Sequence, residues 1–446
     1  MKPVHIQRVY DEALAHASYL VFSGGEAVII DPARDPRPYL DKLDAEGAQL
    51  VAIIETHSHA DFVSGHLELH TLTNAPILIS GKAEATFPHR AFDGGDTFQL
   101  GKVTLTAIDT PGHSHDSICV LVSFQGKQIM VFTGDTLFVG DVGRPDLRQS
   151  EGEAANKKEQ LAKSLYHSLR EQLVVLDPEA VVLPAHGAGS LCGKGIGDEP
   201  SSTIGKELEQ NPALREMDED AFVTWLLDDQ PFVPQYFPYN VEVNKQGAPK
   251  LQDSLDSVRR ESFGFDPETD VVIVDIRDEA TFKLGHHPAA LNIQDGGKFE
   301  TWLGALVPPR EPYYLIAQDD EALEKVIRKA AKIGYATYIR AAFPMRESAA
   351  AGRLDPIDLP DFREHPDRYT IVDVRNASEV AKGKTFASAL AIPLPELQER
   401  VGEIPTDKPV VVHCAGGYRS AIAASIVAAR TDGVKIFDLG EAVKDF

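Results

Sequence analysis

Four apolar runs, each followed by a histidine or an aspartate, constrain this chain most strongly. Leu50–Ile54 precedes the cluster His57-Ser58-His59-Ala60-Asp61, and later runs precede His113, Asp135 and His186. Short β-rich runs bounded by turn-forming residues predict strands, so each of these side chains should lie on a loop that leaves a buried strand. One such trio is equally compatible with a solvated loop, but its recurrence favours a metal site. We expect four strands to deliver the side chains to one edge of a sheet, where they converge on one metal ion.

Length and charge limit the classes of protein to consider. The chain has 446 residues, which predicts two to four domains. Its hydrophobic content of 43% and charged content of 25% are typical of a soluble globular protein. The formal net charge of -24 argues against non-specific nucleic-acid binding and would repel anionic substrates unless local basic groups intervene.

Cysteine usage and the first residues indicate the compartment. The three cysteines, Cys119, Cys192 and Cys414, are far apart and form no CxxC pair, so a reducing cytosol fits better than a disulfide framework. Met1 to Tyr10 lacks the apolar core of a signal peptide, and no run approaches membrane-spanning length. We expect a cytoplasmic protein without a membrane partner.

Further local signals outline the first region. Leu20–Phe22 and Ala27–Asp31 flank Gly24-Gly25, which predicts a hairpin, and Pro38–Ala45 has the polarity of a helix. Residues 229–256 contain four prolines among polar and aromatic residues. Because proline breaks regular elements, this segment predicts a linker, with its aromatic side chains pinning it to a neighbour.

Three motifs of the first region resemble those of a known family. They are Thr56-His57-Ser58-His59-Ala60-Asp61, Gly134-Asp135-Thr136-Leu137-Phe138 and Gly143-Arg144-Pro145-Asp146. They resemble the metallo-β-lactamase superfamily, and within it the persulfide dioxygenases, which implies an αββα sandwich of two sheets with helices outside. Hydrolases of the superfamily, such as glyoxalase II, usually place a histidine directly after the motif's aspartate to bind a second metal. Here that position is Phe62, which argues against a two-metal hydrolase.

The resemblance implies a site with one Fe(II) per chain and no organic cofactor. Its ligands would be His57, His113 and Asp135. Two histidines and one carboxylate leave coordination positions open, as in non-haem Fe(II) oxygenases that bind O2 and substrate together. The remaining motif residues would orient the ligands or bound water; they are His59, Asp61 and His186. A hydrogen-bonded loop histidine is the alternative for His186.

Substrate contacts are implied on two segments near this site. Arg144 resembles the family's substrate-positioning arginine, and a guanidinium suits a carboxylate or phosphate, although such an arginine can equally form a structural ion pair. Gly187–Lys194 is a glycine-rich and therefore flexible loop that resembles the loop of dioxygenases fused to rhodanese modules. Glutathione-dependent members have tyrosine at the position of Ala188, so glutathione is disfavoured as the carrier thiol. Cys192 would line the pocket or bear a persulfide.

The last part of the chain repeats itself. Val271–Arg277 matches Tyr369–Arg375, and a further apolar strand follows in each copy, Tyr313–Ile316 and Val410–His413. The alternation of strands and helices predicts two small α/β domains with parallel sheets. Both copies resemble rhodanese (sulfurtransferase) domains.

Only the second copy carries a reactive loop. Cys414 follows a strand and is followed by a glycine-rich turn into the helical run from Ala421. Backbone N–H groups and the helix dipole stabilise a thiolate at such a position, and Arg419 adds positive charge. The residues expected to hold the sulfur substrate there are Gly416, Gly417 and Ser420. The first copy has Ala317 where Cys414 aligns, followed by Gln318-Asp319-Asp320, so it is expected to be inactive.

These observations predict three parts in the fold class α/β. Residues 1–245 would form the metallo-β-lactamase-fold dioxygenase, 246–350 a linker with an inactive rhodanese-like domain, and 351–446 an active rhodanese domain. The resemblance implies oxidation of a thiol persulfide by O2 to sulfite, with sulfur transfer between persulfide, sulfite and thiosulfate in either direction. It also implies a homo-oligomer, either a dimer or a tetramer. The carrier thiol stays open between coenzyme A, bacillithiol, cysteine and glutathione. The alternatives are a thioester or lactone hydrolase fused to a sulfur carrier, and a non-enzymatic sulfur-binding scaffold.

Overall fold

The computed structural model describes residues 3–147, 154–268, 270–346 and 352–446. The chain forms two compact units. One comprises Met1–Asp253 and Ala331–Gly334, and the other comprises Ser254–Ala330 and Tyr335–Phe446. The domain limits at 245 and 350 stay predictions, and the second of them lies outside the described residues.

The first unit contains two six-stranded sheets. The strand order of the first sheet is β1-β2-β3-β4-β5-β6, and that of the second is β12-β11-β10-β9-β8-β7. The first sheet consists of β1 (His5–Asp11), β2 (His16–Ser23), β3 (Glu26–Ile30), β4 (Gln49–Ile54), β5 (Ile77–Ile79) and β6 (Arg90–Ala91). The second consists of β7 (Thr97–Leu100), β8 (Val103–Asp109), β9 (Ile118–Phe124), β10 (Lys127–Gly134), β11 (Val181–Pro184) and β12 (Ser202–Thr203).

The β2–β3 hairpin shows how the sequence fixes the first sheet. Ser23 pairs with Glu26 across the two-residue turn Gly24-Gly25, and both glycines have positive φ, +65° and +86°. Such turns match the right-handed twist of the flanking strands and favour glycine. Every residue of β2 is buried, because the sheet is covered on both faces.

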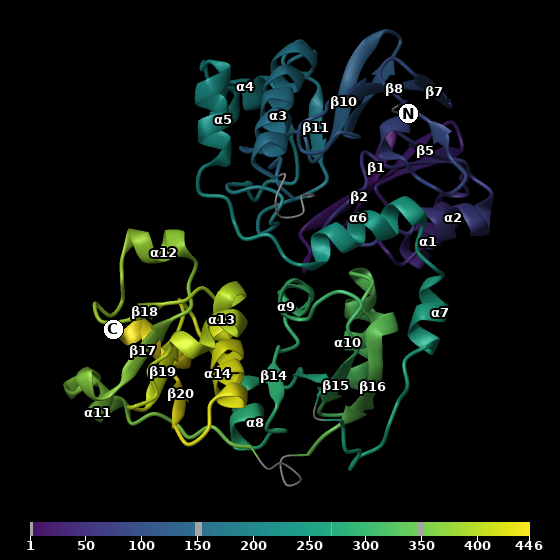
Figure 1. Cartoon of the computed structure of the whole chain (residues 1–446). Helices are drawn as coiled ribbons and strands as arrows, with labels where there is room; N and C mark the ends of the chain where they lie inside the picture. The colour runs from purple at the N-terminus through teal and green to yellow at the C-terminus, as the bar shows by residue number, and fades with distance from the viewer. Residues whose placement is uncertain (1–2, 148–153, 269, 347–351) are drawn as a thin grey trace. The chain divides into compact units, whose positions relative to one another are not determined.

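Three cores confirm the expected αββα sandwich. The central core lies between the sheets and combines side chains of both, including Val21, Val28, Ile54, Leu105, Val120 and Phe132. A second core joins the outer face of the second sheet to α3 (Ala154–His167) and α5 (Glu219–Leu227), and a third joins the outer face of the first sheet to α1 (Arg37–Glu46) and α2 (His66–Thr73). Figure 1 shows these two groups of helices beside their respective strands, with α4 (Ile204–Gln210) next to α3 and α5.

The expectation that the four ligand-bearing strands share one sheet is wrong. His57 follows β4 of the first sheet, whereas His113, Asp135 and His186 follow β8, β10 and β11 of the second. Period and composition identify strands, but sheet membership depends on pairing between distant segments. The loops nevertheless meet, because β4, β10 and β11 run parallel to neighbours in their own sheets and end at the same edge of the sandwich.

The expectation that prolines keep residues 229–256 free of regular elements is wrong, although the boundary between the two units does fall within this segment. This segment forms α6 (Tyr236–Gln246) and α7 (Leu251–Asp256). Pro238 lies in the first turn of α6, where backbone N–H groups have no partner within the helix and proline is tolerated. The aromatic pair Tyr236 and Phe237 is buried, as expected for side chains that pin the segment to its neighbours.

The second unit contains two parallel four-stranded sheets with the same order. One is β14-β13-β15-β16 and the other β18-β17-β19-β20. Their strands are β13 (Val272–Asp275), β14 (Ala290–Asn292), β15 (Tyr313–Ala317), β16 (Ile339–Pro344), β17 (Thr370–Asp373), β18 (Leu390–Ala391), β19 (Val410–His413) and β20 (Ile436–Asp438). All pairs are parallel, so the internal repeat in the sequence corresponds to a repeat in topology.

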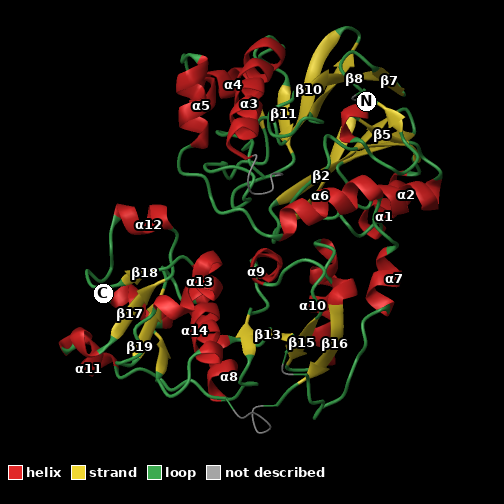
Figure 2. Cartoon of the chain, viewed as in Figure 1, coloured by secondary structure: helices red, strands yellow, loops and turns green. Residues whose placement is uncertain are grey.

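Helices cover these sheets. They are α8 (Glu279–Leu284), α9 (Phe299–Leu306), α10 (Asp320–Lys332), α11 (Leu359–Glu364), α12 (Ala377–Lys382), α13 (Leu394–Arg400) and α14 (Tyr418–Arg430). Figure 2 shows α14 between β14 of the first repeat and the sheet of the second. The two repeats therefore share α14, whose Ser425 Oγ accepts a hydrogen bond from the Asn292 N–H at 2.9 Å. Across the described residues, every helix is too short or too polar to cross a bilayer.

Two hairpin glycines allow a test of how closely the sheets are packed. Gly101 and Gly126 both have positive φ, but a Cβ on Gly101 would lie 2.3 Å from the Ser23 carbonyl oxygen, whereas a Cβ on Gly126 would meet nothing within 4 Å. We expect Gly126→Ala to cost about 1 kcal/mol from backbone strain, and Gly101→Ala to cost about 1–3 kcal/mol more from overpacking. Thermal unfolding of the two variants measures the difference, and equal Tm values would contradict it.

Candidate functional site

A buried group of two histidines and one carboxylate lies where the loops of the two sheets meet. Asp135 Oδ2 is 3.9 Å from His57 Nε2 and 3.6 Å from His113 Nε2. One ligand atom from each of the three residues lies within 4.8 Å of the others, and all three side chains are buried. The structure thus brings together the three residues that the sequence predicts as metal ligands; their role as ligands stays a prediction.

Hydrogen bonds orient His57 toward this group. The Thr56 hydroxyl donates to Asp31 Oδ2 at 2.9 Å and also lies 3.0 Å from His57 Nδ1. Its single hydrogen is used toward Asp31, so it accepts from the N–H at His57 Nδ1. His57 therefore presents the lone pair of Nε2 to Asp135 and His113, which is the form of histidine that binds a metal.

Gly143 sets the position of Asp135. A Cβ at residue 143 would lie 1.8 Å from the Asp135 carbonyl oxygen and 3.0 Å from His113 Nδ1. Only a glycine lets the backbone of residue 143 pass this close to both residues. The requirement explains why glycine opens the segment Gly143-Arg144-Pro145-Asp146.

The three residues expected to orient ligands also lie together. His59, Asp61 and His186 offer atoms within 4.8 Å of one another, and all are buried. His186 Nε2 is 3.3 Å from Asp61 Oδ2 and 3.5 Å from Asp135 Oδ1, and so it connects the two groups. His186 Nδ1 lies 3.2 Å from the Ala15 carbonyl oxygen, which requires the hydrogen at Nδ1. His186 is thus more than a hydrogen-bonded loop residue, because its other nitrogen faces two carboxylates.

Acidic groups give the site a negative potential. Burial opposes charge on His186, but Asp135 and Asp61 outweigh it and raise its pKa well above the ordinary value. Burial likewise opposes charge on His59, but Asp31 at 3.1 Å and Glu55 at 3.8 Å from its Nε2 raise its pKa. Asp31 and Glu55 are buried residues that the sequence patterns did not single out.

The residues present fit a bound transition-metal ion. Within the described residues, neither carboxylate oxygen of Asp135 receives a hydrogen bond, although the side chain is only 2% exposed. Ligand atoms that share one ion at bond lengths of ~2.1 Å are about 3–3.5 Å apart. The separations of 3.6 and 3.9 Å from Asp135 Oδ2 to the two histidines are slightly longer. A cation between these atoms would satisfy a buried carboxylate that otherwise lacks a donor.

Phe62 fills the space beside this site. Its ring centroid is 4.4 Å from that of His59 and 3.8 Å from that of His16, and its side chain is 1% exposed. Burial lowers the pKa of His16 well below its ordinary value, so His16 is neutral. His16 begins β2 and was missed by the sequence patterns, because every residue of β2 is buried and nothing local distinguishes this one.

Arg144 forms hydrogen bonds with neighbouring residues of the chain. Its Nε and Nη2 each donate to Asp146 at 2.6 Å, and its Nη1 lies 3.4 Å from the Leu191 carbonyl oxygen. The guanidinium is nearly fully buried. This bidentate pair with Asp146 is the structural ion pair that the sequence allowed as an alternative. A role of Arg144 in binding substrate stays a prediction.

Hydrogen bonds anchor the end of the glycine-rich loop, and its expected flexibility stays a prediction. Asp141 Oδ2 accepts hydrogen bonds from the N–H groups of Lys194 at 2.8 Å and Gly195 at 2.7 Å. The Arg144 N–H donates to the Cys192 carbonyl oxygen at 3.0 Å. Cys192 is thereby held with its sulfur within 4.8 Å of ligand atoms of Asp135 and His186, and burial raises its thiol pKa.

The predicted sulfur site in the second unit has the expected local geometry. Cys414 directly follows β19 and is 2% exposed, and its Sγ accepts a hydrogen bond from the Gly417 N–H at 3.1 Å. Gly417 has φ of +101°, and a Cβ there would lie 3.2 Å from the Glu441 nitrogen. Ser420 Oγ donates to the Gly417 carbonyl oxygen at 2.9 Å, while Gly416 is exposed.

Arg419 is paired with an acidic residue of α12. Its Nη1 and Nη2 donate to the Glu379 carboxylate at 2.6 and 2.8 Å, and this pair raises the pKa of Arg419. The sequence predicts that the positive charge of Arg419 stabilises the Cys414 sulfur. In the structure that charge is paired with the Glu379 carboxylate. The catalytic role of Arg419 stays a prediction.

Residues 11–186 match the family model described as the metallo-beta-lactamase superfamily. A hydroxyacylglutathione hydrolase of Methylobacillus flagellatus is 32% identical over 212 residues, which cover 44% of this chain and 82% of that protein. The chain belongs to the metallo-beta-lactamase superfamily. Human persulfide dioxygenase ETHE1, mitochondrial, is 27% identical over 215 residues, covering 48% of this chain and 76% of that protein. A crystal structure of a metallo-beta-lactamase from Staphylococcus aureus has a TM-score of 0.69 and 30% identity, covering 77% of this chain and 99% of that chain.

The C-terminal part of this superfamily member is a rhodanese-like domain. Residues 358–442 match the rhodanese-like domain model. The expected fold class is confirmed: a metallo-beta-lactamase fold precedes a rhodanese-like domain, and the sheets of the second unit are parallel. The identity of the first repeat as a second rhodanese domain stays a prediction.

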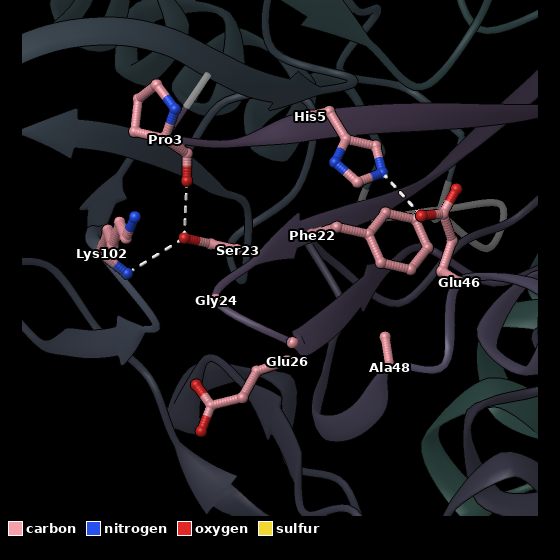
Figure 3. Close-up of a pocket in the computed structure, with 10 residues that line it drawn as sticks. Pro3, His5, Phe22, Ser23, Gly24, Glu26, Glu46, Ala48 and Lys102 are labelled. Atoms are coloured by element: carbon pink, nitrogen blue, oxygen red, sulfur yellow. Dashed lines mark hydrogen bonds and ion pairs between the residues drawn. The ribbon is translucent and has the colours of Figure 1, made fainter. Parts of the chain in front are cut away.

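A pocket elsewhere in the metallo-beta-lactamase fold does not belong to this site. Figure 3 shows that it surrounds the Gly24-Gly25 turn and includes His5, Glu46 and Lys102. This turn is at the far end of β2 from His16, about 23 Å away at the usual rise of a strand. His5 stacks on Phe22 and pairs with Glu46, so its polar group is already used.

Phe62 provides a test of how many metal ions the site holds. We expect the natural chain to bind one transition-metal ion and Phe62→His to bind about two, because an imidazole would join His59, Asp61 and His186 as a further ligand. Phe62→Leu is the control, since it removes the ring without adding a ligand. Metal analysis after dialysis measures the ratio, and two ions in the natural chain would contradict the prediction.

Proposed function

We propose that the chain is a bifunctional enzyme of sulfide metabolism. Its first unit would oxidise a low-molecular-weight thiol persulfide with O2 to sulfite, and Cys414 would transfer sulfur between persulfide and sulfite or thiosulfate. The observation that carries the proposal is the buried group of His57, His113 and Asp135, together with a phenylalanine, Phe62, packed against the neighbouring His59. The similarity to human persulfide dioxygenase supports it.

The proposed metal is one Fe(II) held by His57, His113 and Asp135. Iron in such a site would supply a centre where O2 and a substrate sulfur anion bind together and S–O bonds form. His186 and His59 would keep the ligands in place, because each is fixed by buried carboxylates. The overall reaction consumes one persulfide anion, O2 and water and yields a thiolate, sulfite and two protons.

Phe62 and Cys192 would shape the substrate side of the site. The Phe62 ring occupies the place of a second-metal ligand and excludes water from His16 and His59. The buried Cys192 thiol stays neutral because burial raises its pKa, so it offers a soft, uncharged wall to a sulfur substrate. In a chain of net charge -24, an uncharged wall avoids further repulsion of an anion.

The Cys414 loop would carry sulfur as a persulfide. In the transfer step the sulfur lone pair of sulfite attacks the outer sulfur of the Cys414 persulfide. A new S–S bond forms, the old one breaks, and its electron pair stays on Cys414 Sγ, giving thiosulfate. The Gly417 N–H and the N-terminus of α14 would stabilise the thiolate that leaves. The reverse reaction uses the same contacts.

The first repeat would be a rhodanese-like domain without chemistry. Its sheet has the same order as that of the second repeat, and Ala317 ends the strand that corresponds to β19. Asp319 Oδ1 accepts the Ala322 N–H at 2.8 Å at the start of α10. A fixed carboxylate thus occupies the helix N-terminus that serves sulfur in the other copy, and would repel a sulfur anion.

A thioester hydrolase is the second candidate. The relative named hydroxyacylglutathione hydrolase favours it, and so does the second group of potential ligands, His59, Asp61 and His186. Hydrolysis needs a metal-bound hydroxide, commonly supported by two metals, so the two candidates differ in metal content.

Metal analysis combined with O2 uptake separates the two candidates. We expect one iron per chain and O2 uptake that depends on added persulfide, tested on the persulfides of coenzyme A, bacillithiol, cysteine and glutathione. Iron-loaded protein without persulfide is the control. Two zinc ions with thioester hydrolysis and no O2 uptake would refute the dioxygenase. Absence of any turnover would leave only a sulfur-binding scaffold.

Replacement of Cys414 tests the division of labour between the sites. Cys414→Ser should lower thiosulfate formation from persulfide and sulfite by at least about 1000-fold, because the nucleophile is lost. It should leave persulfide-dependent O2 uptake within about twofold of the natural chain. Cys119→Ser is the control, since Cys119 lies in the core of the first unit. Loss of O2 uptake in Cys414→Ser would show that the two sites are not separate.

A further inference from the structure

The segment that carries His57, His59 and Asp61 ends in a stretch of buried backbone. Residues 59–64 are all buried and form no strand or helix, so their polar groups cannot be satisfied by regular secondary structure. A buried backbone N–H or C=O without a partner is costly, and each must find one elsewhere.

One side chain of α6 serves three of these backbone groups. Asn244 Nδ2 donates to the carbonyl oxygens of His59 at 2.8 Å and Phe62 at 2.7 Å, and Asn244 Oδ1 accepts from the Ser64 N–H at 2.8 Å. Asn244 is 2% exposed. An asparagine amide is suited to this role, because it carries two donor hydrogens and an acceptor in one rigid plane.

The same face of α6 makes a further contact with the segment. The Tyr236 hydroxyl donates to the Asp61 carbonyl oxygen at 3.2 Å, and Tyr236 lies two turns before Asn244. Asp61 therefore has its backbone held by α6 and its side chain by His186. Figure 1 shows α6 beside β2 and α1, within the first unit.

Contacts at its C-terminal end keep α6 in place. The Lys245 carbonyl oxygen accepts from the Thr86 N–H at 2.8 Å, and the Leu251 N–H donates to Glu68 at 2.8 Å. A Cβ on Gly247 would lie 2.4 Å from Leu67, so the chain after α6 passes tightly against α2. Asn244 is thus presented from a fixed helix.

We propose that Asn244 is a positioning residue of the metal site. It fixes the backbone of residues 59–64, and through that backbone it sets where His57, His59 and Asp61 place their side chains. The proposal rests on the function proposed above, in which His57, His113 and Asp135 hold a metal ion. Asn244 acts on metal binding without touching the metal.

The matched control is Asn240, one turn earlier on the same face. Asn240 is fully buried, and neither of its side-chain polar atoms has a hydrogen-bond partner within the described residues. Asn240→Ala removes the same volume from the same helix as Asn244→Ala but no hydrogen bond to the segment. The difference between the two variants isolates the contribution of the three bonds.

The experiment measures Co(II) affinity of the full-length chain by competition with a chromophoric chelator, at a temperature well below the Tm of each variant. We expect Asn244→Ala to raise the Kd for Co(II) about tenfold or more, the range found when groups that orient metal ligands are removed. Asn240→Ala should stay within about twofold of the natural chain. Asn244→Asp keeps the shape and the acceptor for Ser64 but loses both donors, and it should weaken Co(II) binding as well.

Each outcome separates the two proposals. If Asn244→Ala and Asn244→Asp retain Co(II) as Asn240→Ala does, the positioning role is wrong while the metal site stands. If Asn244→Ala does not fold, Asn244→Asp decides alone by the same comparison. If the natural chain binds no Co(II), or binds it equally well after Asp135→Asn, the proposed metal site itself is wrong.

Discussion

The burial of Asp135 is the constraint on which the first unit depends. A carboxylate removed from water loses several kcal/mol of hydration that only a cation or well-placed donors restore. Three histidine nitrogens face it at 3.5–3.9 Å, and they arrive on loops from both sheets. The two sheets must therefore be stacked so that their loops open at one edge, and the central core between them fixes that alignment.

The strands and the clustered residues of the site could be predicted from the sequence, because both depend on short-range patterns. Apolar runs identified β4, β8, β10 and β11, and the residues after them do converge. Sheet membership could not be obtained this way, since pairing of β4 with β3 and of β11 with β10 is decided by contacts between distant segments. His16 was invisible for a related reason: a histidine inside a buried strand carries no local signal of what it faces.

The prolines of residues 229–256 led to a wrong prediction about secondary structure. The cost of a proline arises from a lost backbone hydrogen bond, and this cost vanishes in the first turn of a helix. Pro238 occupies such a place in α6, and so a proline-rich stretch became a helix. The role of Asn244 could not be predicted either, because its hydrogen bond to the Ser64 backbone joins residues 180 positions apart. Such a contact produces no local sequence pattern.

The two repeats of the second unit share a topology but place different groups at the start of the corresponding helix. Each joins a buried parallel strand to a helix through a short turn, and the helix N-terminus attracts negative charge. In one copy the group at that place is the carboxylate of Asp319, which accepts the Ala322 N–H; in the other it is the sulfur of Cys414, which accepts the Gly417 N–H. An acceptor for the helix N–H groups is thus present in both copies, whereas a thiol is present in only one of them.

The position of α6 in the chain limits where the first unit can be divided from the second. The helix that holds the histidine segment is encoded after the last strand of the sandwich and directly before the second unit begins at Ser254. A break in the chain between α5 and α6 would separate residues 59–64 from the helix that holds their backbone. A shortened form of the first unit must therefore extend through α6 to keep these hydrogen bonds.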